Sequence, residues 1–362
     1  MSVLDAVEWE ACLLEPVQNP EAEQALRRAS GMVPPGARYF LDSAWVTNAC
    51  AQLRIDQVPL RHLSAELAGL IALAVSQDNS CRYCYAGTRS LMRILGYPED
   101  RIRLLEEDSL VLSPADSAVL TFARRVSRAA PIACAGDGQA LLDVGWSAEA
   151  VKEIAFSAVA NVFFNRLTTL PALPPPERDI ATRWYIRLLR PLIVLRVRPR
   201  RADARNLLTA AQRSGPFAEI VNALDGLPGA ARLRDTIDAA WMSPVLSRRT
   251  KALVFAVVAR GIGCTSCEPE AVRLLAAEGL APPQIEHALA HLGGPELSQV
   301  DCAAAALARE SIWYRPAHIQ RHLRSIRSLF TREQLVELIG VAALANAVCR
   351  LGVAVDIERQ QH

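Results

Sequence analysis

Two short stretches of this chain each place a pair of cysteines three residues apart. One reads Ser-Cys-Arg-Tyr-Cys and contains Cys81 and Cys84, and the other reads Gly-Cys-Thr-Ser-Cys and contains Cys264 and Cys267. Residues three apart share one face of a helix, so the two sulfurs of each pair can approach closely enough to form a disulfide. A helix N-terminus also stabilises a thiolate, because its unpaired N–H groups and its macrodipole favour negative charge. The spacing therefore indicates dithiol redox chemistry.

The same four cysteines allow three other interpretations. Together they could supply four thiolates to a structural metal ion, although no histidine-rich spacing accompanies either pair. A thioredoxin-like site would need a strand–helix–strand context, which the sequence does not show. Inert core packing is the third interpretation, because cysteine is often buried. His287/His291 and His318/His322 have the four-residue spacing of metal ligands on a helix, but we assign both pairs to solvent-facing helix surfaces.

The flanking segments predict that both pairs lie at helix starts. Asp-Asn-Ser precedes Cys81 and supplies capping residues. Pro269 fits only the first turn of a helix, which places Cys267 at or just before that helix start. Ser147 and Thr331 have the character of N-caps for two later helices, each with an acidic or amide residue near the first turn.

Apolar residues at three- and four-residue spacings predict helices throughout the chain. The segments are LAGLIALAV, LMRIL, AVLTFARRV, AVKEIAFSAVANVFFNRL, IQRHLRSIRSLF and QLVELIGVAALANAVCRL, with breaks expected at GYPED, GDG, GWS, LPALPPPE, GGPE and YRPA. VLRVRPR is the only weak strand candidate. The predicted fold class is therefore all-α.

The chain also matches itself at a period of about half its length. The matched positions are Leu63, Ser64, Cys81, Cys84 and Gly96 in the first copy, and Leu246, Ser247, Cys264, Cys267 and Gly279 in the second. Arg166-Leu167 likewise corresponds to Arg350-Leu351. We predict an internal duplication, with one helical domain over 1–178 and a linker plus a second domain over 179–362. The boundary is placed at the proline cluster of 170–179, because prolines stop a helix and stiffen a linker.

Composition limits the classes of function. The 362 residues carry a formal net charge of +2, so no strong field favours nucleic acid or an anionic membrane. The N-terminus lacks the basic region of a secretory signal, and the longest apolar runs, such as LAGLIALAV, have the length of a core helix. The arginine-rich segment 182–205 is assigned to packing rather than to a membrane surface. We expect a soluble cytoplasmic protein, in which nine cysteines do not indicate a disulfide scaffold.

Around the cysteine pairs the sequence resembles the AhpD-like alkylhydroperoxidase and carboxymuconolactone decarboxylase superfamily. The residues that carry the resemblance are NSCRYCYAGTRSLMRILG with NVFFNRL, and GIGCTSCEPEAVRLLAAEGL with NAVCRLG, so it covers most of the chain as two tandem units. The resemblance implies all-helical domains that assemble into homo-oligomers and need neither a metal nor an organic cofactor.

The resemblance also implies a reaction and its partners. Redox members of the family reduce peroxides: the second cysteine, here Cys84 or Cys267, attacks the peroxide oxygen, and the first, here Cys81 or Cys264, resolves the product as a disulfide. Helix-dipole reasoning alone would instead make the first cysteine the more acidic one. The expected partners are a hydroperoxide or disulfide substrate and a thiol reductant protein, with no nucleic acid and no membrane.

The chain departs from the family pattern at the base. Redox members usually carry a histidine four residues after the second cysteine, supported by a glutamate on the preceding helix, to take the thiol proton. Here those positions hold Thr88 and Ala271. Glu66 is the candidate substitute in the first unit, and its counterpart is Arg249. The alternative function is a redox-sensing or structural module, or a non-redox enzyme acting on a lactone or another small molecule.

Overall fold

The computed structural model describes residues 4–54, 58–107, 112–128, 130, 133, 135–175, 191–194, 202 and 205–359. Over these ranges the chain folds into helices without strands, and an isolated β-bridge joins Asn206 and Gly226. The predicted all-α class is therefore confirmed. The weak strand candidate VLRVRPR falls almost entirely outside the described residues.

The helices of the first half are α1 (Pro20–Ser30), α2 (Ala44–Gln52), α3 (Ala65–Asp78), α4 (Arg82–Leu95), α5 (Glu99–Glu107), α6 (Pro114–Ser127), α7 (Ala135–Asp143) and α8 (Ala148–Thr169). Those of the second half are α10 (Ala218–Ala223), α11 (Pro228–Met242), α12 (Arg248–Ile262), α13 (Cys267–Ala277), α14 (Pro282–His291), α15 (Gln299–Glu310), α16 (Pro316–Ile326) and α17 (Arg332–Arg359). Short 3₁₀ turns cover Pro35–Tyr39, Ala211–Arg213 and Arg327–Leu329.

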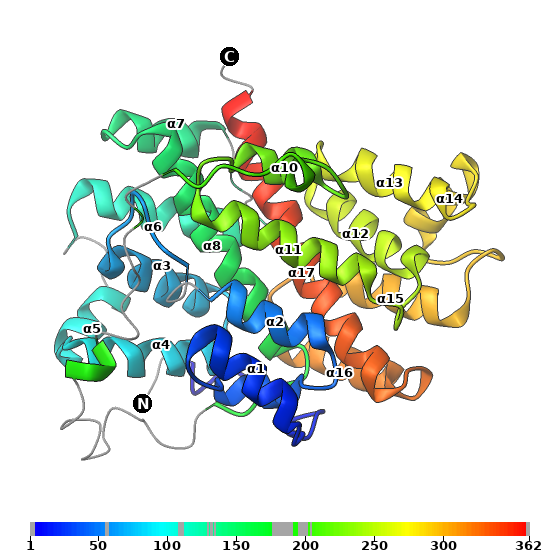
Figure 1. Cartoon of the computed structure of the whole chain (residues 1–362), viewed down its shortest axis with the longest axis horizontal. Coiled ribbons are helices and arrows are strands. Elements are labelled where there is room, and N and C mark those ends of the chain that lie inside the picture. The colour runs from blue at the N-terminus through cyan, green and yellow to red at the C-terminus, as the bar shows by residue number, and fades with distance from the viewer. Residues whose placement is uncertain are drawn as a thin grey trace.

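Helices α8 and α17 pack against each other at the centre of the molecule (Figure 1). On one side α8 is covered by α3, α4 and α6, and on the other α17 is covered by α12, α13 and α15. Apolar side chains from both halves join in one continuous buried cluster. The two predicted domains therefore share a core, and the predicted boundary at 178–179 lies outside the described residues.

Helix α17 contains a longer apolar stretch than the sequence analysis identified. Arg332–Val355 is long and apolar enough to cross a membrane, yet 94% of its most apolar window is buried inside the protein. A helix that is apolar on all sides and covered on all sides is a core helix. This burial fits a soluble protein in which α17 is the central packing element.

The predicted N-caps Ser147 and Thr331 are confirmed, whereas the Asp-Asn-Ser segment does not cap α4, whose N-cap is Cys81 itself. The hydroxyl of Ser147 accepts from the N–H of Ala150 at 3.2 Å, and that of Thr331 accepts from the N–H of Gln334 at 3.2 Å. The predicted break at Gly-Asp-Gly is wrong, because those residues form the first turn of α7. An aspartate there interacts favourably with the helix dipole, which offsets the low helix propensity of the glycines.

A buried carboxylate anchors the start of the cysteine-bearing helix pair in each half. Glu153 of α8 accepts backbone N–H bonds at 2.6–2.7 Å from residues 61–63, just before α3. Glu337 of α17 accepts from the N–H of Leu246 at 3.3 Å, just before α12, and from the ammonium of Lys251 at 2.9 Å. Both central helices therefore fix the position of the helix that leads into a cysteine pair. The duplication itself stays an inference from the sequence.

Candidate functional site

Both cysteine pairs lie at helix N-termini, as the sequence predicts. Cys81 is the N-cap residue of α4, and Cys267 is the first residue of α13. In each pair the backbone N–H of the second cysteine donates to the sulfur of the first, at 3.4 Å for Cys84 to Cys81 and 3.3 Å for Cys267 to Cys264. The first sulfur of each pair therefore receives a hydrogen bond from an otherwise unpaired N–H group at the helix start.

In the first pair a threonine hydroxyl from α8 bridges the two sulfurs. Oγ1 of Thr168 lies 3.2 Å from Sγ of Cys81 and 3.3 Å from Sγ of Cys84. The same hydroxyl donates to the carbonyl of Phe164, one turn earlier in α8, at 2.9 Å. Because a hydroxyl has one proton and two lone pairs, it can accept from a thiol in this state or turn to donate to a thiolate.

The two sulfurs of the first pair differ in exposure and in acidity. Cys81 is fully buried, and Cys84 is partly exposed. Burial alone would raise the pKa of the Cys81 thiol, but hydrogen bonds from Cys84 and Thr168 outweigh it and lower the pKa to about 7. The hydrogen bond to Cys81, together with burial, raises the pKa of Cys84 well above its usual value. The two directions favour the negative charge of the pair on Cys81 over Cys84.

The second pair has a different environment. Cys264 is 1% exposed and Cys267 is 0% exposed. Two residues after the matched arginines, α8 carries Thr168 and α17 carries Gly352. A Cβ atom on Gly352 would lie 2.6 Å from Sγ of Cys264 and 2.9 Å from Sγ of Cys267, so both sulfurs press directly on the α17 backbone. A reactant would reach this pair only if helices moved.

Glu66 is not brought to the cysteines. It lies in the first turn of α3, and Cys81 follows the last turn of that helix. The twelve residues between Glu66 and Asp78 span ~18 Å at 1.5 Å per residue. The Glu66 carboxylate instead contacts the guanidinium of Arg101 at 3.3 Å, and its side chain is half exposed. Arg249, its counterpart, donates to the carbonyls of Glu278 and Glu296.

The sequence analysis missed Thr168, because the residue is distant in the chain from both cysteines. The sequence did contain one indication of its role. The match between Arg166 and Arg350 aligns α8 with α17, so the polar residue Thr168 and Gly352, which has no side chain, occupy corresponding positions. The structure also places Thr88 and Ala271, the two residues that stand where the family carries its histidine base. Thr88 is partly exposed on α4, and Ala271 is fully buried in α13.

No metal centre forms among the described residues. They contain no cluster of three or more His, Cys, Asp and Glu side chains that could hold a metal ion, so the four paired cysteines do not assemble into one site. His287 and His291 are both exposed, with ring centroids 4.6 Å apart. Nδ1 of His318 contacts Glu310 at 2.9 Å. These histidines do not gather further ligands within the described chain.

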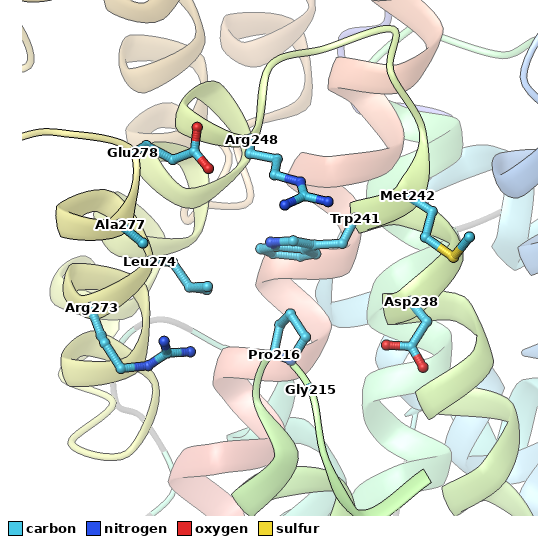
Figure 2. A pocket seen from close by; sticks show the side chains of 10 residues that line it. All are labelled: Gly215, Pro216, Asp238, Trp241, Met242, Arg248, Arg273, Leu274, Ala277 and Glu278. Atoms are coloured by element: carbon cyan, nitrogen blue, oxygen red, sulfur yellow. The ribbon is translucent and has the colours of Figure 1, made fainter. Parts of the chain in front are cut away.

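A separate pocket of about 510 Å³ opens on the second half (Figure 2). Trp241 lies at its centre, and the guanidinium groups of Arg248 and Arg273 point into it from two walls. Arg273 is held by both carboxylate oxygens of Glu270 at 2.8 Å. The lining residues are Gly215, Pro216, Asp238, Trp241, Met242, Arg248, Arg273, Leu274, Ala277 and Glu278. The pocket contains no cysteine, so it is not part of the dithiol site.

Comparisons with protein-family models, with curated proteins and with solved structures found no match for this chain. The resemblance to the alkylhydroperoxidase superfamily therefore stays a prediction based on the sequence motifs, and the functional argument rests on the geometry around Cys81 and Cys84.

Replacing Thr168 with valine tests the bridging hydroxyl. Valine keeps the shape of the side chain and removes the hydrogen bond to the Cys81 thiolate, so we expect the pKa of Cys81 to rise by about one unit and the thiolate fraction at about pH 7 to fall roughly fivefold. A pH titration of thiolate ultraviolet absorbance measures this. Thr121→Val is the matched control, because Thr121 also donates to its own helix but is exposed on α6. Equal titration curves for both variants would contradict the assignment.

Proposed function

We propose that this protein is a dithiol oxidoreductase that reduces organic hydroperoxides, or exchanges disulfides, through Cys81 and Cys84. The observation that carries the proposal is the Thr168 hydroxyl placed within hydrogen-bonding distance of both sulfurs, at 3.2 and 3.3 Å. A buried acidic cysteine beside a partly exposed cysteine is the arrangement that a two-cysteine mechanism needs. In this mechanism Cys84 reacts with the substrate, and Cys81 is close enough to form the disulfide with it.

The Cys81 thiolate replaces the missing histidine base. It accepts the proton of Cys84, either directly or through the hydroxyl of Thr168, and the sulfur of Cys84, the partly exposed residue of the pair, then becomes the nucleophile. Proton transfer between two linked sulfurs moves the charge from the inner position to the outer one. No further side chain is required, and Glu66 has no part in this step.

The reaction balances with a hydroperoxide as the oxidant. The Cys84 thiolate attacks the terminal peroxide oxygen, the O–O bond breaks, and the alkoxide takes the proton held at Cys81 to leave as an alcohol. The Cys81 thiolate then attacks the sulfenic acid on Cys84, and the disulfide forms as hydroxide leaves and takes a proton from solvent. The two sulfurs lose two electrons, which reduce the peroxide. A thiol reductant protein restores the dithiol.

The second pair is assigned a packing role in this proposal. Cys264 and Cys267 are buried, and Gly352 of α17 lies against both sulfurs at the position that corresponds to Thr168. The remaining parts of the proposal come from the sequence: two tandem units of alkylhydroperoxidase type, a homo-oligomer in solution and a cytoplasmic location, where a thiol system keeps the dithiol reduced.

Mapping the disulfides after mild peroxide treatment tests the proposal. We expect Cys81–Cys84 to form and Cys264/Cys267 to stay as they were, as measured by mass spectrometry of alkylated peptides. Because the pKa of Cys81 is about 7, the rate should rise as the pH is raised from about 6 to 8 and level off above that, since the thiolate fraction rises with pH. If peroxide leaves Cys81 and Cys84 unmodified at every pH, the proposal is wrong.

The pocket around Trp241 favours a second candidate function, binding of a small molecule without redox chemistry. Its central indole offers apolar area, and the two arginines offer contacts to an anionic group. The mapping experiment separates the two candidates, because a purely binding protein would show no peroxide-dependent disulfide.

A further inference from the structure

The pocket around Trp241 has a floor of packed aromatic rings. Trp241 of α11 is mostly buried, and its ring lies edge-on to those of Phe217 and Phe255, with centroid distances of 5.5 and 4.9 Å. Phe217 and Phe255 stack on each other at 4.5 Å. Aromatic pairs at these distances attract one another and restrict the orientation of each ring. The indole therefore presents a fixed apolar surface to the pocket (Figure 2).

The segment before α10 forms one wall and has an uncommon backbone conformation. Gly215 and Phe217 both have positive φ angles, of 100° and 56°. The carbonyl of Pro216 accepts from the buried Arg234 at 2.8 Å, and the N–H of Phe217 donates to Glu270 of α13 at 3.4 Å. A phenylalanine rarely adopts a left-handed backbone, and such residues persist only where their surroundings hold them. This wall is therefore fixed by contacts to α11 and α13.

Two of the charged side chains that line the pocket are neutralised by partners in the chain. Asp238 accepts from the guanidinium of Arg234 at 2.6 Å. Arg273 donates to both carboxylate oxygens of Glu270 at 2.8 Å. Each pair has no net charge, so Asp238 and Arg273 contribute shape and hydrogen-bonding atoms to the pocket more than charge.

Arg248 and Glu278 carry the two other charges of the pocket. Neither side chain makes a hydrogen bond or an ion pair within the part of the chain that the structure describes. Both lie at the upper end of the pocket in Figure 2, and the backbone carbonyl of Glu278 accepts from Arg249, the residue after Arg248, at 3.1 Å. One unpaired cation and one unpaired anion therefore lie at the same end of the pocket, next to the apolar surface of Trp241.

We propose that this pocket binds an α-amino acid with a large apolar side chain. The carboxylate of the ligand contacts Arg248, its ammonium contacts Glu278, and its apolar side chain lies against Trp241. A ligand with both charges neutralises both residues, whereas a simple anion would bring a second negative charge close to Glu278. The volume of about 510 Å³ is within the range of small-molecule sites. The inference rests on the second candidate function, small-molecule binding, and does not depend on the dithiol chemistry.

Isothermal titration calorimetry with three probes tests the inference. L-phenylalanine carries both charges, 3-phenylpropionate lacks the ammonium, and phenethylamine lacks the carboxylate. We expect L-phenylalanine to bind the wild-type protein at least roughly tenfold more tightly than either of the other probes, because a hydrogen bond between charged groups contributes about a factor of ten or more in affinity.

Arg248→Gln and Glu278→Gln are matched controls for each other. Arg248→Gln should weaken the binding of L-phenylalanine and 3-phenylpropionate roughly tenfold and leave phenethylamine unchanged. Glu278→Gln should weaken L-phenylalanine and phenethylamine by a similar factor and leave 3-phenylpropionate unchanged. Neither substitution breaks a side-chain hydrogen bond or ion pair within the described chain, so both variants should keep the circular dichroism spectrum of the wild-type protein.

The outcomes separate this inference from the candidate function on which it rests. If 3-phenylpropionate binds as tightly as L-phenylalanine, or if Glu278→Gln leaves L-phenylalanine binding unchanged, the assignment to amino acids is overturned and small-molecule binding stands. If none of the three probes binds at concentrations up to about 10 mM, both the inference and the second candidate function are overturned. The dithiol proposal is judged separately, by whether peroxide forms the Cys81–Cys84 disulfide.

Discussion

Replacing Cys84 with serine is expected to lower the rate of hydroperoxide reduction by roughly a thousandfold or more. Cys84 is the partly exposed residue of the first pair, and a serine hydroxyl in its place has far too high a pKa to attack a peroxide oxygen. The measurement is the loss of an organic hydroperoxide under excess dithiol reductant. Cys81→Ser removes both the proton acceptor and the resolving sulfur, so the first step should slow as well, and the sulfenic acid that does form on Cys84 should persist for a sulfenic-acid reagent to trap.

Cys267→Ser provides the matched control for this prediction. The variant makes the same chemical change at the corresponding position of the second half, where the sulfur is 0% exposed. We expect its rate to stay within about twofold of the wild-type rate. A large loss in Cys267→Ser with full activity in Cys84→Ser would place the chemistry in the second half and reverse the proposal.

Local signals in the sequence were sufficient to predict much of the fold. The positions of Ser147, Thr331 and Pro269 fix three helix starts, because caps and a first-turn proline act within a few residues. Pro269 also places Cys267 at a helix N-terminus, and the polar residues before Cys81 indicate a helix start there, where Cys81 itself is the N-cap. Helix periodicity then gives the all-α class. Each of these features depends on residues that are close together in the chain.

The chemistry of the site depends on packing, which local patterns do not encode. Thr168 reaches Cys81 and Cys84 only because α8 crosses the end of α3 and the start of α4. The burial of Cys264 depends on Gly352, which lets α17 approach the sulfurs closely. Both contacts join distant parts of the chain, so no spacing rule reveals them.

The length of α3 separates Glu66 from the cysteine pair. The apolar run that starts after Glu66 predicts an uninterrupted helix, and twelve residues of helix separate its ends by ~18 Å. A carboxylate at one end cannot reach a thiol beyond the other end. The rise per residue alone therefore argues against Glu66 as the base, and the partner sulfur is left as the proton acceptor.

Replacing Glu337 with glutamine is expected to cost about 3–5 kcal/mol of unfolding free energy, because it leaves the charge of a buried lysine unpaired. Nζ of Lys251 lies 2.9 Å from the Glu337 carboxylate, and both side chains are 0% exposed. The ammonium also donates to the carbonyls of Ala240 and Ser243 at 2.7 and 2.6 Å, so its position is fixed by three acceptors. Glutamine keeps the size of the side chain but removes the negative charge. Urea unfolding followed by circular dichroism measures the change.

The penalty of Glu337→Gln should shrink as the pH rises from about 7 to 10. Burial lowers the pKa of Lys251, and the bond to Glu337 opposes that effect, so loss of the carboxylate lowers the pKa further. The folded variant then binds fewer protons than the unfolded chain, and its stability rises with pH. Asp100→Asn is the control, because Asp100 pairs with Arg103 on the surface and is 88% exposed, and surface pairs contribute at most about 1 kcal/mol. A loss below about 1 kcal/mol for Glu337→Gln, unchanged by pH, would mean that this ion pair does not hold α17 to the start of α12.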